Sequence, residues 1–127
     1  MSDLNVPSVV AELSAVYDRY ETALVGNDVF VMQELFWNSP HAIRYGATEN
    51  LYGYTEIEAF RKSRPAAGLA REIVRKEIVT FGRDSGAVNI EFRRTIGGRV
   101  RIGRQSQFWR RLPDGWRIVS AHVSMIP

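Results

Sequence analysis

The chain of 127 residues contains no cysteine. That absence excludes disulfide bonds, thiolate nucleophiles and zinc sites built on cysteine. Histidine is nearly absent as well, because His41 and His122 are the only two. Two histidines do not by themselves make a standard metal site, and no carboxylate lies at a spacing from either histidine that is typical of metal ligands. The sequence therefore predicts no metal site and no cysteine-dependent reaction.

Long hydrophobic runs are also missing. The longest apolar stretches are far shorter than the roughly 20 residues that a membrane-spanning helix needs, and no signal-peptide pattern opens the chain. We therefore expect a cytoplasmic protein without membrane contact. With 45% hydrophobic and 24% charged residues, the composition is typical of a globular protein. The length fits a single domain over residues 1–127.

Lysine is rare, with only Lys62 and Lys76, so arginine carries most of the positive charge behind the net charge of +3. Arginine-rich proteins suit anionic partners, and nucleic acid is one of these. However, glutamates are interleaved with the arginines, so no long basic stripe forms, and no nucleic-acid motif is present. A small anionic substrate is therefore preferred over nucleic acid as the partner.

The first half of the chain predicts helices joined by short strands. Apolar residues recur three and four positions apart over residues 7–25, as on the buried face of an amphipathic helix. Pro7 suits the first turn of that helix, and Gly26-Asn27 suits its end. Asp28 and Thr55 are the expected N-caps of two further helices. The expected elements are helices over 7–25, 29–36 and 55–63, with short strands over 40–46 and 50–52.

The second half predicts a series of long strands. Four segments rich in β-branched residues are separated by clusters of turn residues. Strands joined in this way form an antiparallel meander, and helices followed by such a sheet give an α+β fold. The turn Pro113-Asp114-Gly115 pairs Gln107 with Ala121 and Gln105 with Val123. The predicted strands cover 70–81, 87–95, 100–112 and 116–126.

The order of elements and one C-terminal stretch carry a family resemblance. The stretch is Asp114-Gly115-Trp116-Arg117-Ile118-Val119, followed by His122-Val123-Ser124. Together they resemble the nuclear-transport-factor-2-like (NTF2-like, or SnoaL-like) superfamily over essentially the whole chain. The resemblance implies a cone-shaped α+β fold, in which a curved antiparallel sheet wraps around N-terminal helices, and a homodimer formed through the outer sheet face. Function does not follow, because this fold hosts isomerases, dehydratases, hydrolases and assembly domains.

Arg44 and Tyr20 are the first candidates for functional residues. Arg44 shares its strand face only with Ala42 and Gly46, which leaves space in front of its guanidinium for a planar anion. The alternative is a rim arginine in water. Glu49, in the turn that follows, is expected to be a solvated or capping group and not part of an acid/base pair. Tyr20 lies on the apolar stripe of the first helix. It is either a core tyrosine bonded to a backbone carbonyl or a phenol that donates a proton inside the cone.

Two glutamines suit a ligand pocket. Gln105 and Gln107 share one face of their strand and have small apolar neighbours, and an amide both donates and accepts hydrogen bonds. The alternative is a polar outer face used for contact between subunits. His122 lies on the opposite face, where we expect it to hydrogen-bond across the sheet to Ser106 or Ser124.

Five segments carry a closer resemblance: residues 38–46, 64–65, 68–71, 103–107 and 115–124. They are similar to the small proteins of oxalurate catabolism and cyanuric acid catabolism that are found beside amidase-type hydrolases. The characterised activity in that family is cofactor-free decarboxylation of 1,3-dicarboxyurea to allophanate, so the resemblance implies no metal or organic cofactor. The essential residues of the family, a first-helix tyrosine and an arginine on the following strand, fall on Tyr20 and Arg44.

This resemblance leads to a hypothesis for the site. Arg44 binds a substrate carboxylate, while Tyr20 donates a proton or hydrogen bond near the departing group. Gln105 and Gln107 hold the urea core, and Arg71 meets the second carboxylate. The alternative function is a non-catalytic, dimeric partner that binds an amidase or stabilises its product.

Overall fold

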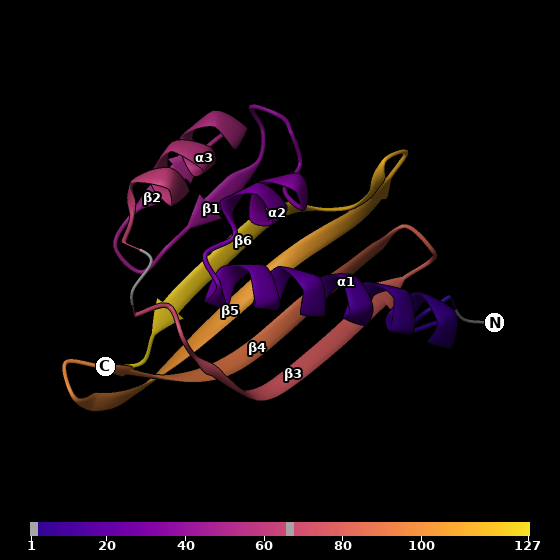
Figure 1. The fold of residues 1–127 in the computed structure, drawn as a ribbon. Helices are drawn as coiled ribbons and strands as arrows, with labels where there is room; N and C mark the ends of the chain where they lie inside the picture. The colour runs from indigo at the N-terminus through magenta and orange to yellow at the C-terminus, as the bar shows by residue number, and fades with distance from the viewer. Residues whose placement is uncertain (1–2, 66–67) are drawn as a thin grey trace.

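The computed structural model describes residues 3–65 and 68–127. These residues form three helices and six strands in the order α1-α2-β1-β2-α3-β3-β4-β5-β6 (Figure 1). The helices are α1 (Pro7–Val25), α2 (Val29–Glu34) and α3 (Tyr54–Ser63). The strands are β1 (Ile43–Tyr45), β2 (Asn50–Tyr52), β3 (Glu72–Phe81), β4 (Ser85–Ile96), β5 (Arg99–Leu112) and β6 (Gly115–Met125).

The strands join in one sheet in the order β2-β1-β6-β5-β4-β3. Strands β3 to β6 form the predicted antiparallel meander, and the predicted pairing of Gln107 with Ala121 and of Gln105 with Val123 is confirmed. The sheet is mixed, however, because β1 is added parallel to β6. The β1–β2 hairpin joins the meander from a distant part of the chain, so local turn residues could not indicate this pairing.

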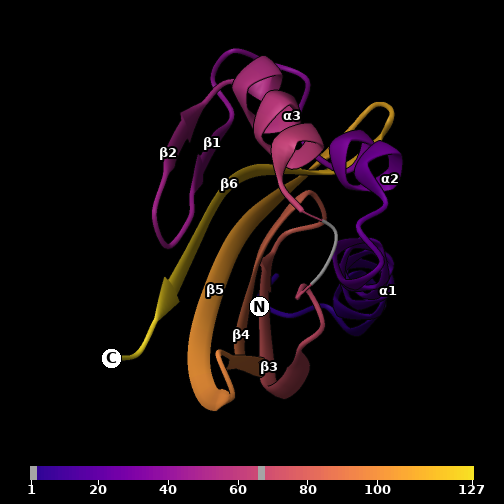
Figure 2. The same cartoon turned by 60° about the vertical axis from the view of Figure 1, so that its left-hand side comes forward.

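The sheet curves strongly around α1, as expected for the cone-shaped α+β class (Figure 2). Helix α1 crosses the concave face, while α2 and α3 cover the end of the sheet near β1 (Figures 1 and 2). Two glycines allow side chains of α1 and of the neighbouring strands to pack closely inside the cone. A side chain at Gly103 would overlap the ring of Phe92, and one at Gly86 would meet Leu13 of α1 at 2.7 Å. The interior of the cone is therefore tightly packed between α1 and the central strands.

Helix ends are set by local signals in α1 and α2. Pro7 occupies the first turn of α1, and the helix ends at Gly26, after which Asn27 adopts a positive φ of 53°. The Asp28 carboxylate accepts a hydrogen bond from the amide of Val31 at 3.2 Å. The predicted start and end of the first helix and the predicted cap of the second are confirmed.

Two helix boundaries differ from the prediction for tertiary reasons. Helix α2 ends two residues early, because Phe36 forms a parallel bridge with Ile118 of β6. The N-cap of α3 is Gly53 rather than Thr55. The Gly53 amide donates to the carbonyl of Ala42 at 2.7 Å, which ties the start of α3 to the segment before β1. Both contacts hold the helices over the β1 end of the sheet.

Candidate functional site

Tyr20 is buried in the cone, with only 1% of its surface exposed. Its ring packs edge-on against Trp109 of β5 at 6.4 Å between ring centres and lies 6.3 Å from the ring of Phe36. The phenol oxygen accepts a hydrogen bond from Arg61 Nη2 at 2.7 Å. No described residue accepts the hydroxyl proton in return. The tyrosine is therefore held by a cation and not by a backbone carbonyl, and its proton is available.

Arg61 was not identified from the sequence, although it lies one helical turn after the buried Ile57 of α3. Its side chain is fully buried. Besides Tyr20, it donates to Met32 Sδ at 2.8 Å, and its guanidinium carbon lies 5.3 Å from the centre of the Phe36 ring. Its Nε is buried without a hydrogen-bond partner, and no carboxylate of the described residues pairs with it. A charge buried in this way costs on the order of several kcal/mol unless an anion compensates it.

Arg44 of β1 also lies in the interior, with 6% of its surface exposed, so it is not a rim arginine. Its Nη1 donates to Glu49 Oε2 at 3.0 Å, and its guanidinium carbon lies 5.4 Å from the ring centre of Phe60. The Glu49 carboxylate fills the space above Gly46, where any side chain would overlap it. The expectation of a solvated or capping Glu49 missed this ion pair: Arg44 and the absence of a Gly46 side chain draw the carboxylate inward, although 21% of the Glu49 side chain stays exposed. The space predicted for a planar anion holds a carboxylate of the protein itself.

Arg64 completes a group that we call the arginine cluster: Arg44, Arg61 and Arg64. The guanidinium of Arg64 lies 5.7 Å from the Phe60 ring, on which Arg44 also rests, and its Nη2 is 3.8 Å from Met32 Sδ, to which Arg61 donates. Arg64 Nε is buried without a partner among the described residues. Among the residues that the structure describes, these three cations form only one ion pair, with Glu49. The cluster therefore has an excess of positive charge.

The arginine cluster shifts the pKa of the Tyr20 phenol, and the pKa values of Arg61 and Arg64 are shifted as well. Burial alone raises the pKa of the Tyr20 phenol, but the charges of Arg61 and Arg44 and the hydrogen bond from Arg61 outweigh it, so the net pKa lies below 10.0. Burial lowers the pKa of Arg61. Burial, followed by repulsion from Arg61 and Arg44, lowers the pKa of Arg64 to about 10. The site thus favours added negative charge.

A second, neutralised network lies beside the cluster. Tyr17 donates to Glu21 Oε1 at 2.8 Å, and Arg71 binds the same carboxylate through Nε at 2.8 Å and Nη2 at 2.7 Å. The amide of Gln105 bridges them, since it accepts from Arg71 at 3.1 Å and donates to the Tyr17 hydroxyl at 3.1 Å. Arg71 and Gln105 are thus engaged by the protein. Their predicted contact with substrate stays a prediction.

Gln107 differs from Gln105 because half of its amide is unused. Its oxygen accepts from Trp109 Nε1 at 3.0 Å, but its Nε2 is buried without a partner among the described residues. The register places Ala121 of β6 between Gln107 and Arg44. A small side chain therefore separates Gln107 from Arg44 in the sheet.

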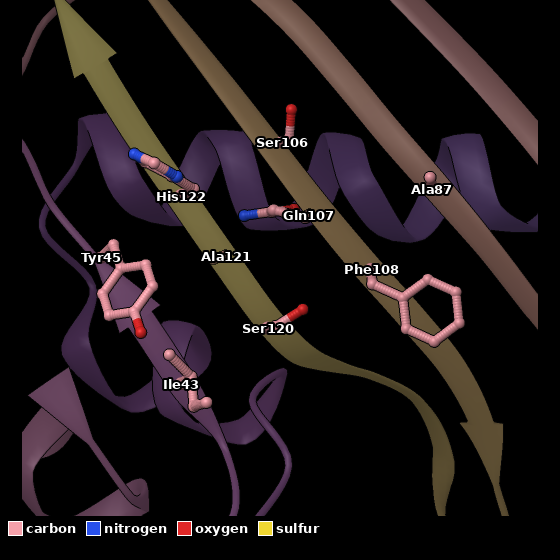
Figure 3. A pocket seen from close by; sticks show the side chains of 9 residues that line it. All are labelled: Ile43, Tyr45, Ala87, Ser106, Gln107, Phe108, Ser120, Ala121 and His122. Carbon is pink, nitrogen blue, oxygen red and sulfur yellow. The ribbon is translucent and has the colours of Figure 1, made fainter.

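The opposite face of the sheet carries a separate hollow of about 370 Å³, which Figure 3 shows on the side turned away from α1. The His122 ring lies edge-on to Tyr45, with 5.7 Å between ring centres. The expected bond from His122 to Ser106 or Ser124 is wrong, because Ser106 donates to Asn89 at 2.6 Å and His122 turns toward Tyr45. His122 is therefore remote from the arginine cluster.

No group of three or more metal-ligating side chains is found in residues 3–65 and 68–127. None of the helices in this part of the chain is long and apolar enough to cross a membrane.

These features define the class of protein: an α+β cone of the NTF2-like, or cystatin-like, fold with charged groups buried inside it. Solved structures agree. A putative ketosteroid isomerase from Parabacteroides distasonis is 17% identical, with a TM-score of 0.70 over 87% of this chain and 85% of its own, and shares the fold. More specifically, the chain belongs to the AtzH-like family, whose model matches residues 2–127.

Two solved structures are much more similar. A protein of unknown function of the DUF3225 family from Pectobacterium atrosepticum is 50% identical, with a TM-score of 0.94 over 98% of this chain and 96% of its own. A cystatin-like fold protein from Burkholderia xenovorans is 41% identical, with a TM-score of 0.91 over 99% and 98% of the two chains. No curated protein matches the sequence. The comparisons thus give the fold and the family, and the activity has to be argued from the site.

Proposed function

We propose that this protein is an enzyme that decarboxylates a small carboxylated urea, such as 1,3-dicarboxyurea, to allophanate in nitrogen-compound catabolism. The observation that carries the proposal is the state of Tyr20: a buried phenol whose oxygen is held by Arg61 and whose proton has no acceptor among the described residues. Such a phenol is a positioned proton donor. The proposal rests on that geometry together with membership of the AtzH-like family.

The reaction needs one proton and one anchored carboxylate. An N-carboxylate loses CO₂ readily once its nitrogen is protonated: the C–N bond breaks and its electron pair stays on nitrogen. In our proposal Arg44 binds the carboxylate through its planar fork, and Tyr20 delivers the proton to the nitrogen. The phenolate left on Tyr20 is stabilised by Arg61 until solvent returns the proton. The lowered pKa of Tyr20 makes it a stronger donor than an ordinary phenol.

Gln107 supplies the remaining polar contact in this proposal. Its buried Nε2 donor suits the carbonyl oxygen of a urea, and the register places only the small Ala121 between Gln107 and Arg44. The balanced reaction consumes the dianion and one proton and yields the allophanate monoanion and CO₂. No redox change occurs, so the chemistry asks for no electron carrier.

The test is a direct measurement of CO₂ release from 1,3-dicarboxyurea by the purified protein. We expect turnover by the protein alone and its loss in Arg44→Ala. Oxalurate serves as a second substrate, because it distinguishes a carboxylated urea from a related ureide. Absence of CO₂ release from both compounds by folded protein would contradict the proposal.

An accessory role is the second candidate, and the outer face of the sheet favours it. Phe108 is 39% exposed there and lines the hollow of Figure 3 on the side away from Tyr45. A partly apolar face of this kind suits a homodimer contact or an amidase partner. Mixing the protein with an amidase of ureide catabolism tests this: an accessory protein changes the rate of the amidase and releases no CO₂ by itself. Sedimentation of the pure protein tests the dimer.

A further inference from the structure

We propose that Arg61, together with Arg64, forms a second carboxylate-binding subsite opposite Arg44, so that the site selects dianions over monoanions. This inference rests on the proposed function for the identity of the substrate, but not for the binding preference itself. It concerns Arg61 of α3, which the proposed reaction uses only to hold Tyr20, and Arg64, the residue after the helix, which that reaction does not use.

The first argument is the surroundings of Arg61. All of its contacts are neutral: a thioether, a phenol and the faces of two aromatic rings. Buried guanidinium groups in proteins are normally compensated by carboxylates or phosphates. Arg71, which is nearly as buried, shows the normal situation with its two bonds to Glu21. Arg61 is therefore a buried cation without a counter-ion among the described residues, and an anion bound beside it would compensate its charge.

The second argument is the count of charges in the arginine cluster. Three guanidinium groups are linked through Phe60 and Met32, and Glu49 is the only carboxylate that pairs with any of them among the described residues. Two positive charges stay unpaired. A substrate with two carboxylates neutralises them, whereas a substrate with one leaves a buried charge.

The third argument is the pair of donors left free close together in the chain. Among the described residues, Arg61 Nε and Arg64 Nε are both buried without partners, and they belong to the last turn of α3 and to the residue after it. Arg64 is only half-buried, so it links the interior to the surface. One carboxylate bound by these two donors and a second bound by Arg44 would hold a short dicarboxylate across the Tyr20 hydroxyl.

This arrangement also accounts for product release. Loss of CO₂ converts a dianion into a monoanion, so the product gives up one of the two charge-assisted contacts. Each such contact is worth about tenfold or more in affinity. A site built for two carboxylates therefore binds the substrate more tightly than the product.

The test is calorimetric binding of glutarate and butyrate. Glutarate places its carboxylates the same number of bonds apart as 1,3-dicarboxyurea, and butyrate lacks one of them. We expect the wild-type protein to bind glutarate at least about tenfold more tightly than butyrate. Arg61→Gln is expected to remove that preference while Arg99→Gln, at the exposed start of β5, retains it. Arg61→Lys, which keeps the charge, is expected to restore part of it.

The outcomes separate this inference from the proposed function. Equal binding of the two ligands by the wild-type protein, no binding of either, or an unchanged preference in folded Arg61→Gln overturns the dianion subsite. A glutarate preference in a protein that releases no CO₂ supports the subsite and contradicts the decarboxylase. If Arg61→Gln does not fold, the wild-type comparison and Arg64→Gln still decide, because loss of Arg64 is expected to weaken glutarate and leave butyrate unchanged.

Discussion

Tyr17 and Tyr20 lie one turn apart on α1 and are both buried, yet their surroundings are opposite. The Tyr17 hydroxyl donates to Glu21 and accepts from Gln105, so both of its hydrogen-bonding roles are used. The Tyr20 hydroxyl accepts from Arg61 and donates to no described residue. Burial and residue type are therefore the same in the two places, and only the charges around them differ.

The difference comes from the position of one carboxylate. Glu21 neutralises Arg71 and receives the Tyr17 proton, which makes that network self-sufficient. No carboxylate reaches Arg61 among the described residues, so the region around Tyr20 keeps its positive charge. A saturated network stabilises a fold, whereas unused donors and unpaired charge indicate a binding site. In our proposal the structural role therefore falls to Tyr17 and the chemical role to Tyr20.

The largest expected effect is on turnover after loss of one hydroxyl. Tyr20→Phe keeps the ring and its packing but removes the proton donor, so we expect the rate of CO₂ release to fall by about 10²–10⁴. Tyr17→Phe is the matched control in the neighbouring turn, with an expected change of less than about tenfold. Both rates are measured under single-turnover conditions. An equal loss in the two variants would remove the distinction between the two regions.

The next effect is on stability, and its sign distinguishes the two buried arginines. Arg71→Met leaves Glu21 buried without its partner, so we expect a loss of about 3–5 kcal/mol in the free energy of unfolding. Arg61→Met removes a charge that has no counter-ion, so we expect a change between zero and a gain of about 2 kcal/mol. Urea denaturation of the ligand-free proteins measures both. A large loss in Arg61→Met would mean that Arg61 is a structural cation.

A third effect is the pH at which each phenol ionises. The folded pKa of Tyr20 lies below 10.0, despite burial, because of Arg61 and Arg44. Burial and the charge of Glu21 raise that of Tyr17 above 10.0. Between the folded pKa of Tyr20 and 10.0 the unfolded chain binds the extra proton, so Tyr20 adds stability as pH rises. Above 10.0, Tyr17 removes stability as pH rises, because its folded form keeps the proton.

Ultraviolet titration of tyrosinate in the wild-type protein and the two Phe variants measures these pKa values. We expect the earliest tyrosinate signal of the buried tyrosines to vanish in Tyr20→Phe and to persist in Tyr17→Phe. The opposite assignment would contradict the electrostatic comparison.

Periodicity was sufficient to place Tyr20 on the buried stripe of its helix, because helical spacing is a local property of the sequence. Strand spacing alone left Arg44 open between the interior and an exposed rim, and the family resemblance was needed to favour the interior. Periodicity was not sufficient for Arg61. That residue has the spacing of a buried position after Ile57, but an arginine in the last turn of a helix is typical of a solvated dipole partner. The sequence also could not predict which arginines lack a counter-ion. Glu21 and Arg71, for example, are 50 residues apart and are paired only by the fold.

The smallest expected effect concerns Glu49, which forms an ion pair with Arg44 in the way that we propose for a substrate carboxylate. Its side chain is 21% exposed, so solvent screens the ion pair and its displacement is inexpensive. Glu49→Gln removes the competing charge, and we expect glutarate to bind about three- to tenfold more tightly, as measured by calorimetry. Glu58→Gln, on the exposed side of α3, is the control and is expected to leave the affinity unchanged. Weaker binding in Glu49→Gln would mean that Glu49 orients Arg44 for the substrate and does not compete with it.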